Sequence, residues 1–497
     1  MSITVQTPYG SLSGMKDGRT TRYLGIPYAK PPVGELRFRE PQPIEAWEGT
    51  MTAAKYAKDP MQSNTKFGPE YFSEDCLYLN VWVPEHTADG KLPVMVWIPG
   101  GAYSTGGSGA KSPDGPSLYE CGIMAEDTGC IIVSVSYRLN VFGFLNLSQY
   151  SDRFEDDLGM KDLVLALKWV NRCIGAFGGD AGNVTLFGES AGAGAISALL
   201  CIEEARPYFQ KVIMQSNCFG SFYTPEEEAD VAEKYLNFLG LDTSRAEGLL
   251  EKPYPELIAA TARLTEYVLE HYFGRCTFCP VVDGNFITDY PTLANLAQLG
   301  KPVLVGSNRN EGNFLTFSYR WAGRDSEKLC RALLRNLPED RREDILRCYP
   351  LPGKQALADM LTDVMYTFPR LRLAEHVSSG GSVYMYRYDF VAPVMRLMGL
   401  QACHVAEMIP LFDLKEKPYV TFGIGARGIL KQIGTRMRRY WGAFARTGVP
   451  AVSGQVEWKP YEKQHRYTLV IGKEDQLVSD ADAAVRERYD GIDRILI

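Results

Sequence analysis

The segment Gly188-Glu189-Ser190-Ala191-Gly192 carries the clearest chemical signal in this chain. An apolar run over 183–187 precedes it and the small-residue stretch 191–200 follows, so the pattern predicts a strand, a sharp turn and a helix. Such a turn strains the backbone of the serine, and small neighbours avoid a clash. It also lifts the hydroxyl clear of the sheet, in front of a helix N-terminus that favours negative charge. We therefore predict Ser190 as a nucleophile.

A serine nucleophile needs a base, and the chain has five histidines: His86, His271, His376, His404 and His465. Where such a turn carries the nucleophile, its partners follow in the order serine, acid, histidine, which excludes His86. His376 lies in an amphipathic helical pattern and His465 in a polar segment, both ordinary places for surface histidines. His271 has no strand behind it. His404 lies in a loop after the predicted core strand 383–390, and we predict it as the base.

The third partner should lie between the other two, at the end of another strand. The run 301–306 has the pattern of a short buried strand and leads into the turn-rich loop 307–312, which carries a single acid, Glu311. A carboxylate there can accept the imidazole N–H, which fixes the tautomer and stabilises the imidazolium. The alternative for Glu311 is a solvated loop residue.

Two other acids are rivals for this role because they lie close in sequence to His404. Asp389 belongs to the predicted strand itself, and Glu407 is only three residues from the histidine, too local for partners that come from different elements. The sequence therefore favours Glu311 over both.

Acyl transfer also needs donors for an oxyanion. The predicted strand 92–98 leads into Pro99-Gly100-Gly101-Ala102-Tyr103, whose small residues let successive N–H groups point into a site. We assign the N–H groups of Gly101 and Ala102 as donors, with that of Ala191 as the third. The alternative is an ordinary turn, since Gly-Gly is common in turns.

With these segments in place, the chain resembles the type-B carboxylesterases, a family of α/β-hydrolases that includes bacterial p-nitrobenzyl esterases, animal carboxylesterases and cholinesterases. The resemblance runs nearly from end to end. Its further motifs lie at 23–29, 31–34, 37–38, 74–81, 136–139, 177–180, 280–284 and 440–445. It implies an α/β-hydrolase fold, with a mostly parallel central sheet flanked by helices and helical insertions that form a substrate gorge. It also implies a glutamate as the acid, in agreement with Glu311.

Four positions depart from the family pattern. Pro99 stands where the family often has histidine, and Ala102 replaces a third glycine, as in bacterial members. Cys76, in the motif at 74–81, lacks the partner cysteine expected near residue 60. Asn310 precedes the acid where aspartate is common. None of these changes removes a reacting atom.

The resemblance also suggests two supporting residues. Ser216 is expected to hydrogen-bond to the Ser-Glu-His triad. Glu189 is expected either to tune the charge near the nucleophile or to have a purely structural role.

Composition agrees with a large soluble enzyme. The 497 residues are 45% hydrophobic, which is ample for one large core, and the net charge of −7 argues against nucleic-acid binding. The expected partner is a small-molecule ester, and the chemistry needs neither a metal nor an organic cofactor. The sequence does not indicate an oligomeric state.

Cysteines and the N-terminal residues bear on location. No signal peptide is visible after Met1, and no run approaches the roughly 20 apolar residues of a membrane span. The chain has eleven cysteines and is too long to need disulfide cross-links for stability, which suggests that the thiols are reduced. Cys276 and Cys279 have the spacing of a redox or zinc pair, but no second pair exists, so we expect two packed thiols. We expect a cytoplasmic, bacterial protein without disulfides.

The organisation is that of a single elaborated domain over residues 1–497. Strands are predicted near 93–98, 130–136, 183–187, 211–215, 302–306 and 383–389, alternating with helices. Insertions near 104–116, 225–275 and 315–380 are expected to form the walls of the gorge. Their aromatic residues, which are as consistent with core as with a binding role, are Phe219, Phe222, Tyr223, Tyr319 and Trp321.

These features together predict a serine hydrolase that cleaves carboxylic esters through an acyl-enzyme. Two alternatives stay open: an amidase or peptidase with the same triad, and a non-catalytic adhesion protein of the same fold. Adhesion proteins of this type lose the nucleophile or the base, whereas this chain has all three partners. A lipase acting on long chains would be expected to show an apolar lid.

Overall fold

The computed structural model describes residues 2–62, 69–85, 90–109, 119–218, 220–291, 296–317, 324–414, 419–493 and 495–496. The chain forms two compact units. Unit 1 comprises Met1–Gln210 and Ser221–Tyr290, and unit 2 comprises Lys211–Gly220 and Pro291–Ile497. His86, Phe219, Tyr319, Trp321 and the part of the predicted insertion from 110 to 116 lie outside the described residues.

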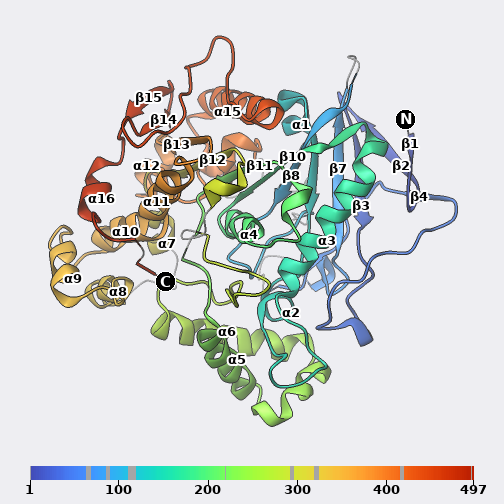
Figure 1. Ribbon diagram of the computed structural model, residues 1–497, viewed down its shortest axis with the longest axis horizontal. Helices are drawn as coiled ribbons and strands as arrows, with labels where there is room; N and C mark the ends of the chain where they lie inside the picture. The colour runs from blue at the N-terminus through green and yellow to red at the C-terminus, as the bar shows by residue number, and fades with distance from the viewer. Residues whose placement is uncertain are drawn as a thin grey trace. The chain divides into compact units, whose positions relative to one another are not determined.

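Unit 1 contains strands in the order β1-β2-β3-β7-β9-β8-β10, with β4 against β2 (Figure 1). Their bounds are β1 Ser2–Thr7, β2 Gly10–Asp17, β3 Thr20–Pro27, β4 Thr50–Thr52, β7 Tyr78–Pro84, β8 Leu92–Ile98, β9 Ile131–Val135 and β10 Gly179–Glu189. Strand β8 pairs in parallel with both β9 and β10, while β1, β2, β3 and β7 form an antiparallel flank that meets β9. A separate parallel ladder joins β5 (Asp59–Pro60) and β6 (Phe72–Ser73).

The central strands β8 and β9 of unit 1 are almost wholly apolar. Every residue of β8 and β9 is buried, as expected for parallel strands covered on both faces. The register places Ile98, the last residue of β8, opposite Gly188 near the end of β10. The loop after β8 and the turn after β10 therefore start side by side.

Helices α3 and α4 pack against these strands (Figure 1). The α-helices of unit 1 are α1 Gly122–Thr128, α2 Asn140–Phe144, α3 Leu158–Cys173, α4 Ala191–Leu200, α5 Pro225–Phe238 and α6 Tyr254–His271. Its 3-10 turns are η1 Gly34–Leu36, η2 Pro69–Tyr71, η3 Ile174–Phe177, η4 Arg206–Tyr208 and η5 Thr243–Glu251. Leu163, Leu167 and Val170 lie on one face of α3 at helical spacing and are all buried.

Helices α5 and α6 pack against each other and confirm the helical character of 225–275 (Figure 1). Helix α5 starts with a capping box: the Thr224 hydroxyl accepts from the Glu227 N–H, and the Glu227 carboxylate accepts from the Thr224 N–H. Pro225 is the first helical residue, where its missing N–H costs nothing.

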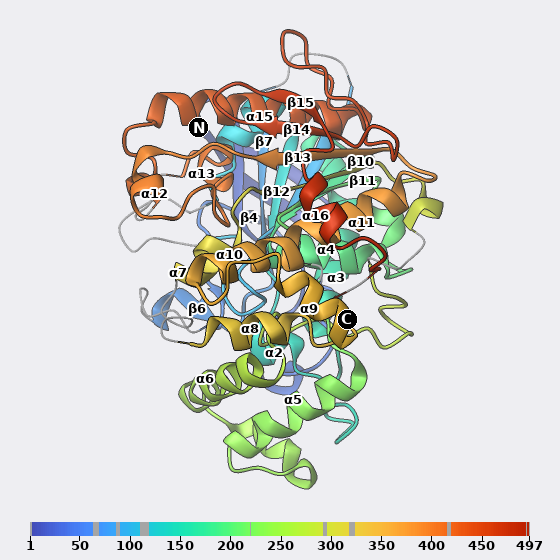
Figure 2. The ribbon, with the colours of Figure 1, turned by 90° about the vertical axis from the view of Figure 1, so that its left-hand side faces the viewer.

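Unit 2 contains strands in the order β11-β12-β13-β14-β15 (Figure 2). Their bounds are β11 Lys211–Gln215, β12 Val303–Asn308, β13 Val383–Tyr388, β14 Tyr467–Ile471 and β15 Gln476–Ser479. The first four are parallel neighbours, and β15 pairs antiparallel with β14. Gly306 lies opposite both Gln215 and Tyr386, and a Cβ there would lie 2.1 Å from the Tyr386 ring. Glycine thus lets that ring lie over β12.

The helices of unit 2 surround these strands, and α7 and α10 pack side by side (Figure 2). They are α7 Gly312–Phe317, α8 Ser326–Leu333, α9 Glu339–Leu346, α10 Lys354–Thr362, α11 Phe368–Val377, α12 Pro393–Leu397, α13 Met408–Leu411, α14 Tyr419–Phe422, α15 Arg427–Thr447 and α16 Ala483–Arg488, with the 3-10 turn η6 Leu296–Leu299 and the π-helical turn η8 Asp363–Thr367. Trp441 of α15 packs on Tyr386 of β13. Arg438, also on α15, is buried and donates to the carbonyls of Pro410 and Leu411 at the end of α13.

All six strands predicted from the sequence are confirmed. The antiparallel flank β1, β2, β3 and β7, and the strands β14 and β15, were not predicted. Among the described residues, none of the helices has the length and apolar character needed to cross a bilayer.

Candidate active site

Ser190 is the single residue between β10 and α4, and its backbone is strained. Its φ of 56° and ψ of −125° lie in a region that residues with a side chain rarely occupy. A Cβ on Gly188 would lie 2.8 Å from the Ile98 carbonyl oxygen, and one on Gly192 would lie 2.0 Å from it. Both flanking glycines are therefore required because β8 and the turn pass so close to each other. Ser190 is 8% exposed.

The loop after β8 runs directly against this turn. A Cβ on Gly100 would lie 2.4 Å from the Glu189 carbonyl oxygen and 3.1 Å from Ser190 Cβ. Gly101 and Ala102 follow with φ values of 125° and 54°, and the Gly101 carbonyl accepts from the N–H groups of Ser104 and Thr105. The three assigned oxyanion residues thus belong to two segments that meet at Ser190.

Pro99, the first departure from the family pattern, is held by its carbonyl group. The Tyr137 hydroxyl donates to the Pro99 oxygen at 2.9 Å, and both residues are buried. The start of the loop is therefore fixed by a backbone group, which does not depend on the side chain at position 99.

In unit 2 the structure brings Glu311 and His404 together. His404 Nδ1 lies 2.7 Å from Glu311 Oε2, and the His404 N–H donates to the Glu311 carbonyl at 3.4 Å. Glu311 follows β12, and His404 lies in the turns between α12 and α13. Glu311 is 0% exposed and His404 6%. This rules out the solvated-loop alternative for Glu311.

The rival acids have other partners. Asp389 accepts from the Arg387 guanidinium at 2.7 and 2.8 Å and forms a longer ion pair with Arg309. Glu407 is fully buried, and it contacts Ser216 Oγ at 3.1 Å and the side-chain amide of Asn308. The sequence argument did not foresee that Glu407 would lie beside Glu311.

Ser216, suggested by the resemblance, contacts the acid of the pair. Its hydroxyl donates to Glu311 Oε1 at 2.6 Å, and the Asn308 N–H donates to the same oxygen at 2.6 Å. Ser216 has a φ of 47°, in the left-handed region, so its backbone is strained at this position. The sequence analysis did not identify Asn308 as a site residue. Its position as the last residue of β12, directly before the loop that carries Glu311, could have indicated it.

Burial and neighbouring negative charges shift the pKa values of the titratable groups in this cluster. Burial raises the pKa of Glu407 to about 7, and the negative charge of Glu311 adds to the rise. Burial also raises the pKa of Tyr386 well above its usual value, and both glutamates contribute. The rings of Tyr366 and Phe314 lie 5.2 and 6.3 Å from the imidazole of His404.

The remaining described histidines lie in unremarkable settings. His271 ends α6, where Nδ1 contacts the Tyr267 carbonyl and the ring stacks on that tyrosine. His376 is exposed on α11, as its helical pattern predicted, and His465 is exposed and stacks on Tyr467.

Glu189, the second supporting residue suggested by the resemblance, is 3% exposed at the end of β10. Its Oε2 would lie 3.1 Å from a Cβ on Gly100, so its side chain lies along the oxyanion loop.

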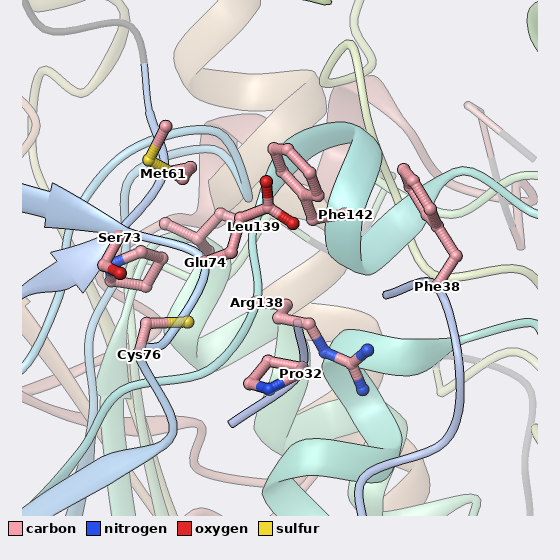
Figure 3. Close-up of a pocket in the computed structure, with 10 residues that line it drawn as sticks. Pro32, Phe38, Met61, Ser73, Glu74, Cys76, Arg138, Leu139 and Phe142 are labelled. Carbon is pink, nitrogen blue, oxygen red and sulfur yellow. The ribbon is translucent and has the colours of Figure 1, made fainter. Parts of the chain in front are cut away.

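The cysteines form no disulfide in the part of the chain that the structure describes. Cys76 lines a surface pocket of unit 1 together with Met61, Arg138 and Phe142 (Figure 3). Burial and the negative charge of Asp162 raise the pKa of the Cys76 thiol well above its usual value, so this thiol is a poor nucleophile. Arg138 is held by Asp162 at 2.7 Å. Neither Cys76 nor Arg138 therefore offers this pocket a reactive group.

In the second cysteine motif Cys279 is buried and Cys276 is half-buried. The Cys279 thiol donates to the Cys276 carbonyl at 3.3 Å, and burial raises the pKa of Cys279 well above its usual value. Among the described residues, no group of three or more His, Cys, Asp or Glu side chains could hold a metal ion.

Comparison with known proteins now identifies the family. The model of the Carboxylesterase family matches residues 1–489. The chain belongs to the carboxylesterase family. It is 33% identical to the para-nitrobenzyl esterase of Bacillus subtilis (strain 168), over 97% of this chain and 98% of that one. It is 30% identical to human carboxylesterase 5A, over 90% and 80% of the two chains.

Comparison with solved structures supports the same family. A thermophilic PNB esterase superimposes with a TM-score of 0.87 at 33% identity, over 98% of this chain and 99% of that one. The expected α/β-hydrolase fold and the resemblance to type-B carboxylesterases are both confirmed, and the protein is a carboxylic ester hydrolase.

Proposed function

We propose that the protein hydrolyses small carboxylic esters through an acyl-enzyme, with Ser190 as nucleophile, His404 as base and Glu311 as the acid that orients the histidine. The observation that carries this proposal is the buried contact of 2.7 Å between His404 Nδ1 and Glu311 Oε2. The strained backbone of Ser190 supports it independently.

In the first step Ser190 Oγ attacks the ester carbonyl while His404 Nε2 takes its proton. Glu311 accepts from Nδ1–H, so the neutral imidazole keeps its lone pair on Nε2 and the imidazolium is stabilised once it forms. His404 then protonates the departing alcohol. Water attacks the acyl-enzyme with the same base, which regenerates Ser190 and releases the acid.

The oxyanion of each tetrahedral intermediate is held by the N–H groups of Gly101, Ala102 and Ala191. The close approach of Gly100 to Ser190 supports this assignment, as does the position of Ala191 at the start of α4. Donors held by the backbone need no rearrangement when the charge develops, which is why such sites are effective.

We further propose that residues 1–497 form one elaborated domain, with the insertions near 104–116, 225–275 and 315–380 forming the walls of a substrate gorge. The match of the family model over residues 1–489 supports a single domain. A cytoplasmic location is proposed on the eleven unbridged cysteines, most of them buried.

Rates on matched substrates test the function. A p-nitrophenyl ester and the corresponding anilide are compared on the wild-type protein, on Ser190→Ala and on Ser197→Ala. Ser197 is a buried serine of α4 that donates to the Gly194 carbonyl and serves as a control. We expect ester hydrolysis, a loss on the order of 10⁶-fold in Ser190→Ala, and little change in Ser197→Ala. Faster hydrolysis of the anilide would favour the amidase alternative.

A further inference from the structure

Two buried carboxyl groups in unit 2 share one hydroxyl. Ser216 Oγ lies 2.6 Å from Glu311 Oε1 and 3.1 Å from Glu407 Oε1. The side-chain amide of Asn308 reaches both acids, Glu311 Oε1 at 3.4 Å and Glu407 Oε2 at a shorter distance. Both glutamates are 0% exposed, so neither carboxyl group is in contact with bulk solvent.

The number of hydrogen atoms available between Ser216 Oγ and the two carboxyl groups determines which carboxyl group must be protonated. A serine hydroxyl has one hydrogen to donate. The shorter contact, to Glu311, takes that hydrogen, so Ser216 Oγ faces Glu407 with lone pairs only. The contact of 3.1 Å is then a hydrogen bond only if Glu407 Oε1 carries a proton.

We propose that Glu407 is a positioning residue: as a neutral acid it donates to Ser216, which donates to Glu311, and this chain of hydrogen bonds holds Glu311 against His404. The inference rests on the proposed function, in which Glu311 and His404 form the acid–base half of the site. It adds a proton that takes no part in the transfers between Ser190, His404 and the substrate, and a residue that does not touch the substrate.

Electrostatics and strain support this arrangement. Two carboxylates in one buried site cannot both ionise cheaply, so one keeps its proton. Glu311 faces the imidazole and is the better place for the charge, and the pKa of Glu407 is raised to about 7. Ser216 keeps a φ of 47° while its N–H donates to the Gly306 carbonyl at 2.8 Å, so its hydroxyl is held between the two acids.

The same arrangement predicts how the site responds to pH. Tyr386 and Tyr388 of β13 and the thiol of Cys403 face Glu407, but burial raises the pKa of each so far that all three stay neutral. Glu311 and His404 are the charged partners of Glu407. When Glu407 loses its proton, a second negative charge favours the imidazolium of His404, and the fraction of neutral base falls.

Glu407→Gln tests this inference because an amide has the shape of a neutral acid. Its N–H can donate to Ser216 Oγ, while its oxygen accepts from Asn308. We expect kcat/KM to fall by no more than about threefold, the size of one altered hydrogen bond. We also expect the acid limb of the pH profile to move to lower pH, because the variant cannot add charge beside the imidazolium. Glu462→Gln, at an exposed glutamate of the same unit, should leave the profile unmoved.

Glu407→Ala removes the group that donates to Ser216 Oγ and leaves a cavity beside it, so kcat/KM should fall by about tenfold or more while the protein stays folded. An infrared difference spectrum at pH 6 between the wild type and Glu407→Gln should show a protonated carboxyl band that the wild type has in excess of the variant, since other buried acids such as Asp157 are common to both and cancel.

The inference is overturned if that band is missing, or if Glu407→Gln loses as much activity as Glu311→Gln. An acid limb that moves to higher pH in Glu407→Gln would also overturn it, because removing a possible negative charge beside His404 cannot favour the imidazolium. Failure of the proposed function would look different, because Ser190→Ala would then keep its esterase activity whatever happens at Glu407.

Discussion

Replacing Glu311 with glutamine should cripple the enzyme through the wrong histidine tautomer. In the structure Glu311 Oε1 accepts from the Asn308 N–H and from Ser216 Oγ, both at 2.6 Å. An amide NH₂ at that end would meet the Asn308 N–H, a donor facing a donor. The glutamine therefore turns its oxygen to Asn308 and Ser216, and its NH₂ toward His404.

This orientation reverses the contact with the imidazole. An NH₂ placed 2.7 Å from His404 Nδ1 must donate, so Nδ1 accepts and the ring proton moves to Nε2. An imidazole protonated on Nε2 cannot take the proton of Ser190. In a serine protease triad the same change of acid to amide lowers turnover by about 10⁴-fold, or about 5.4 kcal/mol of transition-state stabilisation, and we expect a loss of this order here.

The assay is kcat/KM on a p-nitrophenyl ester, with thermal unfolding measured in parallel. Asp389→Asn is the control, because Asp389 pairs with Arg387 and not with the imidazole. We expect Glu311→Gln to unfold within a few degrees of the wild type, and Asp389→Asn to keep most of its activity. The reasoning is refuted if Glu311→Gln stays within about tenfold of the wild type, or if Asp389→Asn is the more damaging change.

Three further outcomes follow from the packing and charge of the described residues. Gly192→Ala should reduce both stability and activity, because its Cβ would lie 2.0 Å from the Ile98 carbonyl and overpacking costs about 1–3 kcal/mol; denaturant unfolding and kcat check this, and an unchanged midpoint would contradict it. All eleven thiols should react with an alkylating agent once the protein is unfolded without reductant, as mass spectrometry would show; a stoichiometric bridge at Cys76 would count against a reducing compartment. The pKa of Asp157 is raised to about 7 by burial, so the stability it contributes is present at acid pH and is lost as pH rises through 7. Asp157→Asn should therefore be more stable than the wild type at pH 8, by up to about 4 kcal/mol, with the gap closing toward pH 4, and a gap that widens toward acid pH would refute this sign.

The sequence predicted the chemistry of the site better than its surroundings. Ser190, Glu311 and His404 each follow a strand whose apolar run is readable, so the order of the chain was enough to select them. Glu407 was set aside because it is near His404 in sequence. Its role depends on the turn before α13, which directs the side chain to Ser216 and Asn308, and local sequence does not report that direction.

The strands likewise differ in how well the sequence predicts them. Strands such as β8 and β9 were predicted because their apolar runs are buried on both faces. The flank β1, β2 and β3 was missed because these strands are mixed in polarity and partly exposed, so their pairing is decided by partners distant in sequence.

Covalent trapping of the nucleophile tests the central claim most directly. The wild-type protein is treated with a phosphonylating ester analogue until activity is lost, then digested and mapped by tandem mass spectrometry. We expect one adduct per chain, on Ser190, and no adduct in Ser190→Ala at the same dose. Loss of activity with the label on another residue, or equal labelling of Ser190→Ala, would contradict the assignment of Ser190 as the nucleophile.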